Sequence, residues 1–501
     1  MKLPYSFARR HGVVITGLAD EAASVALREG DDPSALIEVR RVAGRKLSIE
    51  HVTPARFDRM LADHYAGDGI SAAAAMNDDG LGSLVESIPS AEDLLDSADE
   101  APIIRLINGL IAEAAREGVS DIHIEPYESA LVVRMRVDGQ LTERHRLPAS
   151  VAPMVTSRVK VMARLDIAER RLPQDGRIGL ALGGKSLDVR VSTLPSRAGE
   201  RVVLRLLDKE NAGIGLEALG MPGAIESVFR AALSEPNGMV LVTGPTGSGK
   251  TTSLYAGLKL LNDGSRNILT VEDPVEYAMD GVGQTQVNAR VGLSFAAGLR
   301  AILRQDPDCV MVGEIRDSET ADIAVQAALT GHLVLSSVHT NDAAGAITRL
   351  RDFGVEPFLI ASTLRAVIAQ RLVRRLCPAC AQWAPLDAAR AALVGLATGT
   401  PARHPNPQGC EACGHSGWQG RTGVFEAIRI TEPIRQRIMA GGDEAAIGDV
   451  AFANAATLAV AARSLVEDGL TTPEEAARVM RAGDAPPPVT TPPVLAPVQN
   501  G

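Results

Sequence analysis

The chain has 501 residues, of which 46% are hydrophobic and 22% are charged, and this size and composition are typical of several folded domains. They exclude a single small module and a wholly disordered or fibrous chain. Aromatic residues make up 3% of the chain and the net charge is −10. Neither aromatic stacking nor bulk charge therefore favours a nucleic-acid partner.

The first 101 residues predict a small domain followed by a linker. Residues 1–75 mix β-like stretches, among them 12–15 and 36–39, with amphipathic helix, and predict a small α/β domain. Residues 77–100 carry eight acidic residues and no Lys or Arg, which is most of the excess negative charge. We expect a flexible acidic linker over residues 76–101.

Residues 102–235 predict a second α/β domain. A run with helical periodicity begins at Pro102, and the alternating segments 120–125 and 131–137 predict strands. Asp138-Gly139 after the second strand is a hairpin signal.

Nothing in the sequence predicts passage through a membrane. The N-terminal residues lack the apolar run of a signal peptide, and no segment reaches the roughly 18 apolar residues that a membrane helix needs. We expect a cytoplasmic protein with no transmembrane segment of its own.

The region from residue 236 to 482 predicts the largest domain. Short apolar strands alternate with helices up to residue 376, which is typical of a parallel sheet with crossover helices. The predicted strands are 239–243, 268–271, 310–312 and 333–338. Residues beyond 421 predict helices, and the Pro-rich tail at 483–501 is disordered by composition.

A phosphate-binding loop is predicted directly after the strand 239–243. Residues 244–251 read GPTGSGKT and match GxxxxGK[ST]. Glycines let backbone amides converge on phosphate oxygens, Lys250 reaches the terminal phosphates, and the Thr251 hydroxyl holds magnesium. The alternative, a chance glycine-rich turn, is disfavoured by the flanking strand and helix. The predicted ATP-binding residues are Gly244, Pro245, Thr246, Gly247, Ser248, Gly249, Lys250, Thr251 and Thr252.

Acidic side chains follow two other predicted strands. Glu314 follows the strand 310–312 and is the candidate general base that polarises the attacking water. Gly313 stands where many P-loop proteins have a metal-holding Asp. Residues 272–276 offer further carboxylates at the same edge of the sheet. The alternatives are a helix-capping role for Glu314 and solvated loop acids at 272–276.

Two histidines flank the strand 333–338. His332 and His339 are seven residues apart, so on a regular strand their side chains point to opposite faces and a shared metal is disfavoured. Either histidine serves as a phosphate sensor or a relay to another subunit, or is structural.

Four of the five cysteines form two CxxC pairs, 377/380 and 410/413, separated by 29 residues. Two such pairs can supply four thiolates to a tetrahedral zinc ion. Because no coordination position stays open, we predict a structural zinc bound by Cys377, Cys380, Cys410 and Cys413 within the element 377–421. Reduced thiols that bind no metal are the alternative.

Several motifs occur together and in order. Residues 244–252, 270–277, 300–308, 313–317 and 330–341 resemble the Walker A, Asp-box, Walker B and His-box motifs of bacterial secretion ATPases. Residues 120–126 and 190–205 resemble the family's second N-terminal domain. The resemblance covers roughly residues 100–430 and is strongest to the type II secretion ATPases. One departure is Ala297, where relatives commonly carry Arg.

The resemblance implies an architecture and an activity. It implies a RecA-like P-loop ATPase domain, preceded by two smaller α/β domains and carrying an inserted four-cysteine zinc element and C-terminal helices. It implies a homo-hexamer at the cytoplasmic face of the bacterial inner membrane that hydrolyses ATP with Mg²⁺ and drives pseudopilus assembly and protein export. Residues 1–75 would bind the inner-membrane linker and platform proteins.

The resemblance also implies residue roles. Nucleotide would lie between the second N-terminal domain and the ATPase domain. The implied catalytic residues are Glu314, Lys250, Glu276, His332 and His339, with Arg190 and Arg205 facing the phosphates, and the family favours structural zinc.

Three other functions stay open at this point. A type IV pilus assembly ATPase would have a similar motor and a different partner. A nucleotide-binding scaffold would hydrolyse ATP negligibly. DNA translocation is disfavoured by the acidic balance, although Arg371, Arg374 and Arg375 form a local basic cluster.

Overall fold

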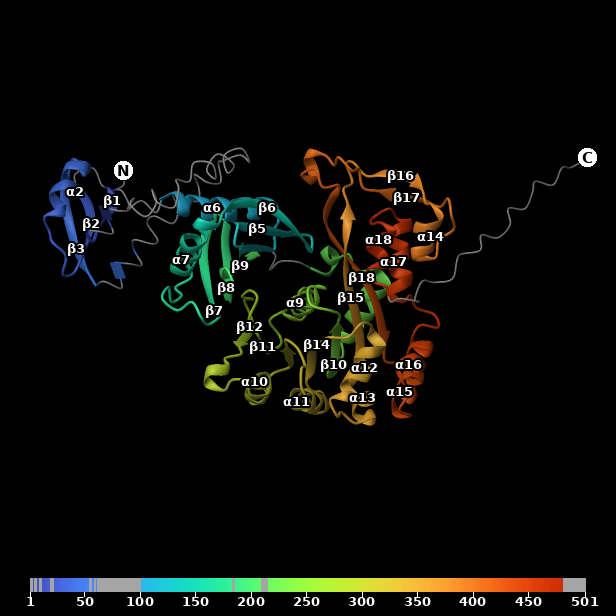
Figure 1. Cartoon of the computed structure of the whole chain (residues 1–501). Coiled ribbons are helices and arrows are strands. Elements are labelled where there is room, and N and C mark those ends of the chain that lie inside the picture. Colours follow the sequence, from blue (N-terminus) through green and yellow to red (C-terminus); the bar gives the residue numbers. More distant parts are fainter. Residues whose placement is uncertain are drawn as a thin grey trace, which may run out of the picture. The chain divides into compact units, whose positions relative to one another are not determined.

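The computed structural model describes residues 3, 7–8, 11–18, 22–53, 56–57, 60, 101–182, 185–208 and 215–480 (Figure 1). Internal contacts divide the chain into two units, Met1–Lys209 and Glu210–Gly501. The predicted linker at 76–101 and the tail at 483–501 lie outside the described residues, apart from Ala101. No helix within the described ranges is both long and apolar enough to cross a membrane.

The N-terminal domain is a three-stranded sheet with a crossing helix. The strand order is β1 (Val13–Leu18), β2 (Ala22–Arg28) and β3 (Lys46–Val52). β1 and β2 are antiparallel, whereas β2 and β3 are parallel and are connected through α2 (Ala35–Ala43). A separate apolar core of this domain includes Val14, Val25 and Val39.

The β-like interpretation of residues 36–39 was wrong, because these residues belong to α2. Ala35, Val39 and Ala43 are buried at a spacing of four, whereas Ile37 is 77% exposed. The helix ends at Gly44, whose φ of 64° is the left-handed conformation common after helices. A stretch of four residues, three of them apolar, is too short to distinguish the two periodicities.

The second domain is a six-stranded antiparallel sheet in the order β6-β5-β4-β9-β8-β7. Its elements are α6 (Ala101–Arg116), β4 (Asp121–Pro126), β5 (Ala130–Val137), β6 (Gln140–Pro148), α7 (Ala152–Met162), β7 (Gln174–Leu182), β8 (Lys185–Ser196) and β9 (Gly199–Asp208). Strands β4 and β5 confirm the predicted strands. Asp138 and Gly139 have φ of 47° and 86° between β5 and β6, as a tight hairpin turn requires.

The second unit is built on a seven-stranded sheet in the order β12-β11-β13-β14-β10-β15-β18. The strands are β10 (Gly238–Thr243), β11 (Ile268–Glu272), β12 (Val282–Gln286), β13 (Cys309–Val312), β14 (Leu333–Val338), β15 (Leu364–Leu376) and β18 (Trp418–Arg429). β18 is antiparallel to β15, and the other neighbours pair in parallel. The predicted parallel sheet is confirmed.

Helices cover both faces of this sheet, so its strands are apolar on both sides. Val240 and Val242 of β10 pack into one core with residues of α8 (Gly223–Leu233) and α9 (Lys250–Leu261). Met239 and Leu241 pack into the opposite core. That core includes α10 (Phe295–Ile302), α11 (Ser318–Leu329), α12 (Ala343–Asp352), α13 (Pro357–Thr363), α15 (Glu432–Met439), α16 (Glu444–Ala451), α17 (Leu458–Glu467) and α18 (Pro473–Ala477).

Two predicted boundaries differ from the structure. The division between the units falls after Lys209, earlier than residue 235, because Phe229 and Leu233 of α8 pack in a core of the seven-stranded sheet. Residues 422–429, predicted as helix, continue β18. Pairing with β15 makes these residues a strand. The two strands are far apart in the sequence, so the Ala-rich and Arg-rich composition of the region does not reveal this pairing.

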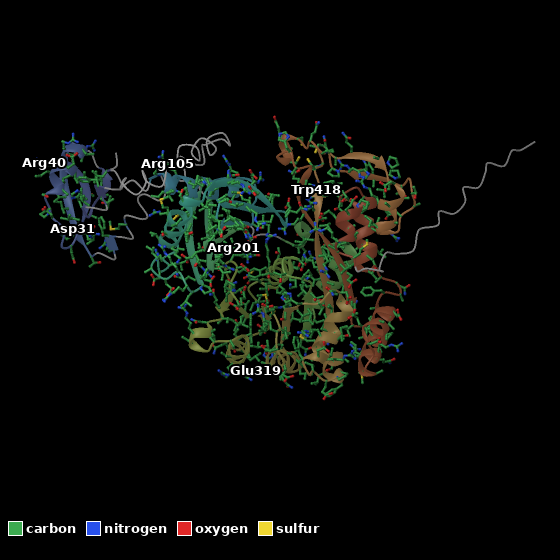
Figure 2. All side chains as sticks on the ribbon, viewed as in Figure 1. Asp31, Arg40, Arg105, Arg201, Glu319 and Trp418 are labelled. Carbon is green, nitrogen blue, oxygen red and sulfur yellow. The ribbon has the colours of Figure 1, made fainter. Side chains whose placement is uncertain are left out.

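The cysteine element is an excursion within one long hairpin. β15 and β18 pair directly, with Leu376 opposite Trp418, and residues 377–417 extend from the end of this pair. The excursion contains β16 (Gln382–Pro385), α14 (Ala388–Val394), β17 (Pro401–His404) and the short helix η5 (Glu411–Cys413). At its base the Arg374 guanidinium lies 3.9 Å from the centre of the Trp418 ring. Figure 2 labels Trp418.

Candidate active site and metal centre

The phosphate-binding loop leaves β10 after Thr243 and enters α9 at Lys250. Gly244 and Gly249 have φ of 148° and 89°, which disfavour other residues. A Cβ on Gly244 would lie 2.3 Å from the backbone oxygen of Gln370, so glycine is required for close approach to β15. The loop therefore has the curled backbone that the motif predicts.

Lys250 is held by the loop itself. Its Nζ donates to the carbonyl oxygens of Gly244 at 2.9 Å and Pro245 at 3.0 Å. Burial lowers the pKa of Lys250 to about 8. The ammonium is thus held at the loop, where it can exchange carbonyl oxygens for phosphate oxygens.

The remaining loop residues fit a phosphate and a magnesium ion. Ser248 Oγ is buried, and no group among the described residues bonds to it. A phosphate oxygen would satisfy this hydroxyl. Thr251 is exposed in the first turn of α9, where helix amides and a hydroxyl favour anions and their bound cation.

Glu314 follows β13, the strand next but one to β10. Its carboxylate pairs with Arg316 and lies 3.0 Å from His339 Nε2. Burial acts to raise the pKa of Glu314, but the hydrogen bond and charge of Arg316, with His339, outweigh it and hold the pKa below its usual range. Glu314 is therefore ionised at neutral pH.

The two neighbouring strands fix the turn that carries Glu314. Gly313 donates its N–H to the oxygen of Val271 at 2.9 Å, and its own oxygen accepts from Ser337 Oγ at 2.8 Å. On the far side of Ser337, Thr340 donates its N–H to Thr243 Oγ1 at 3.0 Å. These bonds join the ends of β11, β13, β14 and β10 along one edge of the sheet.

The predicted carboxylates at 272–276 have different surroundings. Glu272 is 3% exposed and accepts hydrogen bonds from Tyr255, Thr270 and Gln284. Burial, followed by the charge of Glu272, raises the pKa of Tyr255. Glu272 therefore connects α9 to the sheet, whereas Glu276 lies half-buried in the loop beyond β11.

The two histidines lie at opposite ends of β14. His339 reaches Glu314, whereas His332 precedes the strand and its Nδ1 lies 3.0 Å from the oxygen of Ala327. A six-residue strand spans about 20 Å. The structure therefore does not bring His332 together with Glu314.

Arg190 and Arg205 belong to the first unit. They lie opposite each other on β8 and β9, and Arg205 Nε donates to Asp121 Oδ1 at 2.8 Å. Burial acts to raise the pKa of Asp121, but hydrogen bonds from Arg205 and Ser120 outweigh it and keep the pKa low. The contact of Arg190 and Arg205 with phosphate stays a prediction of the resemblance.

Gln370 is a site residue that the sequence motifs did not predict. It lies on β15 beneath the loop, is 2% exposed, and its Oε1 accepts from Ser253 Oγ at 2.6 Å. A Cβ on Gly249 would lie 2.7 Å from Gln370 Nε2. No local motif marks this glutamine, because its role depends on the pairing of β15 with β10.

Ala297 lies in α10, which begins after the capping residue Ser294. Nearby, Arg300 pairs with Glu319 at 2.7 Å, and Arg304 Nη1 donates to the oxygen of Arg300 at 2.9 Å. The two arginines that follow Ala297 in this region are thus engaged with α11 and with α10 itself.

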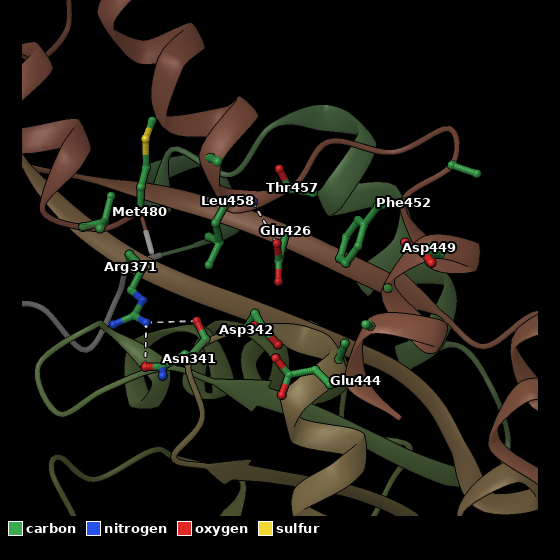
Figure 3. A pocket seen from close by; sticks show the side chains of 16 residues that line it. Asn341, Asp342, Arg371, Glu426, Glu444, Asp449, Phe452, Thr457, Leu458 and Met480 are labelled. Carbon is green, nitrogen blue, oxygen red and sulfur yellow. Dashed lines mark hydrogen bonds between the residues drawn. The ribbon is translucent and has the colours of Figure 1, made fainter. Parts of the chain in front are cut away.

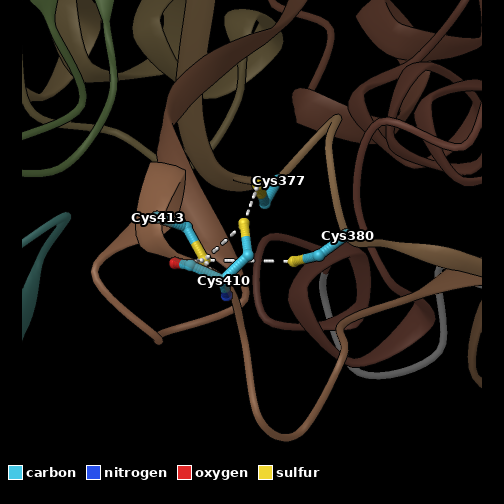
Figure 4. Close-up of side chains that lie close together, drawn as sticks. All are labelled: Cys377, Cys380, Cys410 and Cys413. Atoms are coloured by element: carbon cyan, nitrogen blue, oxygen red, sulfur yellow. Dashed lines mark hydrogen bonds between the residues drawn. The ribbon is translucent and has the colours of Figure 1, made fainter.

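The four paired cysteines converge at one point (Figure 4). Their sulfur atoms all lie within 4.8 Å of one another, and the Cys377–Cys410, Cys380–Cys413 and Cys410–Cys413 separations are 3.8, 3.9 and 3.8 Å. Zn–S bonds of about 2.3 Å in a tetrahedron place sulfur atoms about 3.8 Å apart. The cluster fits a closed tetrahedral zinc site.

Backbone amides support one of these sulfur atoms. Cys413 Sγ accepts from the amides of Cys410 and Gly417, each at 3.2 Å. Burial acts to raise the pKa of Cys413, but these amide bonds outweigh it and lower the pKa to about 6. The amides thus stabilise the thiolate form that a metal ion requires.

The fold and the loop define a P-loop nucleotide-binding protein, and comparisons with known proteins define the family. A profile of the family described as type II/IV secretion system protein matches residues 96–478. A second profile, for an N-terminal domain of GSPII protein E, matches residues 2–65. The chain belongs to the type II/IV secretion system protein family.

Relatives match over nearly the full length. Type II secretion system protein E of Aeromonas hydrophila is 51% identical over 484 residues, which cover 96% of each chain. Type II secretion system ATPase E of Vibrio cholerae serotype O1 is 49% identical over 486 residues, 96% of this chain and 97% of the relative. The resemblance to the type II secretion ATPases, and among them to general secretion pathway protein E, is confirmed.

Two solved structures have a similar fold. The ATPase DotB of Legionella pneumophila has a TM-score of 0.55 at 22% identity and covers 74% of this chain and 94% of that chain. The pilus retraction motor PilT with bound ADP has a TM-score of 0.50 at 25% identity and covers 74% and 96%. These likenesses confirm the predicted fold class.

Proposed function

We propose that this chain is the ATP-hydrolysing motor of a bacterial type II secretion system, which drives pseudopilus assembly and protein export. The observation that supports ATP hydrolysis is that the phosphate loop, Glu314 and His339 lie at the same edge of a parallel sheet. Relatives of almost the same length and about half identical in sequence support the assignment to secretion.

Each site residue has a proposed task in hydrolysis. Lys250 and the loop amides bind and orient the phosphates, and the Thr251 hydroxyl is a ligand for Mg²⁺, which neutralises phosphate charge when bound. The Glu314 carboxylate accepts a hydrogen bond from the attacking water and orients it toward the terminal phosphorus. The water oxygen bonds to that phosphorus while the bond from the phosphorus to the bridging oxygen breaks, and the proton of the water passes to the Glu314 carboxylate. The products are ADP and phosphate.

The neighbours of Glu314 set its position and charge. Arg316 and His339 hold the carboxylate from two sides and keep it ionised. Glu276 and His332 are proposed in supporting roles, and Arg190 and Arg205 as phosphate contacts, on the resemblance alone.

The other assignments are proposals of the same kind. The chain works as a homo-hexamer on the cytoplasmic side of the inner membrane, and residues 1–75 bind the membrane-bound linker and platform proteins. The match of residues 2–65 to an N-terminal domain of GSPII protein E supports a separate docking domain. The four cysteines bind a structural Zn²⁺, which closes the tip of the β15–β18 hairpin.

Steady-state ATP turnover by the purified full-length chain tests this proposal. We expect turnover to depend on Lys250 and on Glu314, so that Lys250→Ala and Glu314→Gln both abolish it. A nucleotide-binding scaffold predicts negligible turnover in the wild type. Turnover that neither substitution changes would place the active site elsewhere.

A second candidate is a motor for type IV pilus assembly, and the likeness to the pilus retraction motor PilT supports a pilus-related function. The two functions differ in the partner of residues 1–75. Affinity capture with this segment is expected to recover a secretion linker protein, whereas preferential recovery of a pilus platform protein would favour the pilus function.

A further inference from the structure

Glu426 holds the N-termini of two helices from different parts of the second unit. It lies on β18 and is 2% exposed. One carboxylate oxygen accepts the N–H of Ala343 at 2.8 Å, and the other accepts the N–H of Leu458 at 2.8 Å. These residues begin α12 and α17. Such amides lack partners within their helices and carry partial positive charge, so a buried carboxylate is well placed there.

The first of these helices begins at the last residue of the segment that carries His339. We call residues 339–343 the His-box segment. Thr340 ties one end of it to Thr243, whose strand leads into the phosphate loop. Glu426 ties the other end to β18. The position of His339 against Glu314 therefore depends on both attachments.

A cavity of about 530 Å³ lies beside Glu426 (Figure 3). Asn341 and Arg371 line it from the side of the nucleotide site, and Glu444, Phe452 and Leu458 line it from the C-terminal helices. A cavity lacks the packing contacts that would otherwise fix its walls. Glu426 spans the two walls through hydrogen bonds instead, as the dashed line to Leu458 in Figure 3 shows in part.

We propose that Glu426 is a positioning residue for ATP hydrolysis. It fixes the His-box segment so that His339 stays within hydrogen-bonding distance of Glu314. When that segment moves, Glu426 transmits the movement to α17. Nucleotide occupancy at the loop is thereby coupled to the C-terminal helices. This role of Glu426 rests on the proposed hydrolysis of ATP at Glu314.

The Glu426→Gln substitution tests the positioning role. Glutamine keeps the shape of the side chain, but its NH2 group cannot accept a backbone N–H, so one of the two helix attachments is lost. We expect kcat to fall about tenfold while KM for ATP stays within about twofold, because misplacement of catalytic groups affects the chemical step.

Glu475→Gln is the matched control. Glu475 is also buried, at 6% exposure, and pairs with Arg374 and Arg478 near the base of the cysteine element. We expect this control to lower the thermal midpoint with little change in kcat. A wild-type kcat for Glu426→Gln, or an equal loss of kcat in the control, would overturn the positioning role.

Hydrogen exchange of the full-length chain, with and without a non-hydrolysable ATP analogue, tests the coupling. In the wild type we expect the analogue to slow exchange in the His-box segment and in α17; in Glu426→Gln only the His-box segment responds. An α17 that does not respond in the wild type overturns the coupling even if the variant fails to fold. A wild type without ATP turnover would instead contradict the proposed function itself.

Discussion

The phosphate loop and the cysteine element leave neighbouring strands of one sheet, yet they are built in opposite ways. In the loop, backbone amides and glycines make a cradle, and Lys250 rests on two carbonyl oxygens that a ligand can replace. In the cysteine element, four side chains converge on one another and leave no open position. The first site is therefore suited to exchanging its ligand, and the second to keeping it.

The comparison predicts that the two sites can be disabled separately, and the largest effect is expected at the loop. Lys250→Ala removes the cation that binds the terminal phosphates, so we expect ATP turnover to fall by more than about 100-fold. Zinc content, measured by elemental analysis, should stay at the wild-type level. Loss of zinc in this variant would contradict the separation of the sites.

Cys377→Ser is the converse change. Because three thiolates hold zinc less tightly than four, we expect loss of the metal and faster proteolysis of residues 377–417. Turnover at a temperature where the sheet is folded should stay within about threefold of wild type. Zinc assay, limited proteolysis and turnover measure this together. A wild type that contains no metal and is equally stable would refute the zinc site.

His339→Asn is expected to have an intermediate effect. It removes the 3.0 Å contact with Glu314 Oε2, while Arg316 still holds the other oxygen. We expect kcat to fall about tenfold. His332→Asn is the matched control at the far end of β14, and its kcat should change less. An equal loss in both variants would show that the contact with Glu314 is not the reason.

The pKa of Lys250, about 8, predicts a pH dependence. Phosphate binds the charged ammonium, so KM for ATP should rise by up to tenfold per pH unit above that pKa. In the nucleotide-free protein the folded pKa lies below the unfolded value of 10.5, so the unfolded chain binds more protons between the two values. The Lys250 contribution to stability therefore increases with pH in that window.

Two measurements check this behaviour. KM measured between pH 7 and 9 gives the dependence on the ammonium, and denaturant unfolding between pH 8 and 10 gives the stability. Lys250→Met should remove the rise in stability. A KM that is flat across this range would show that the ammonium keeps its proton throughout.

The smallest effect is expected at the ion pair of Arg300 and Glu319. The two side chains are 52% and 57% exposed, and exposed pairs contribute only about 0.2–1 kcal/mol. Glu319→Gln should therefore change stability slightly and turnover little. A large loss of turnover would indicate that Arg300, near the Ala297 departure, has a role in hydrolysis.

The sequence predicted the parts of each site that are local in the chain. The phosphate loop is one continuous motif, and each CxxC pair lies on one knuckle, so spacing alone carries the chemistry. The contact of His339 with Glu314 and the place of Gln370 under the loop depend on strand order. The first is set by the pairing of β13 with β14, and the second by the pairing of β10 with β15.

The fold shows the same limit. The short apolar strands of the parallel sheet were predicted because burial on both faces leaves a plain apolar run. Residues 36–39 were assigned wrongly because a short apolar stretch fits either periodicity. Residues 422–429 were assigned wrongly because only their pairing with β15 makes them a strand.

The most direct test of ATP hydrolysis at Glu314 is a pair of measurements on Glu314→Gln: nucleotide affinity and ATP turnover of the full-length chain. The loop is untouched, so ATP should bind with wild-type affinity, while turnover is lost because no carboxylate orients the water. Wild-type turnover in Glu314→Gln would show that this carboxylate does not orient the attacking water.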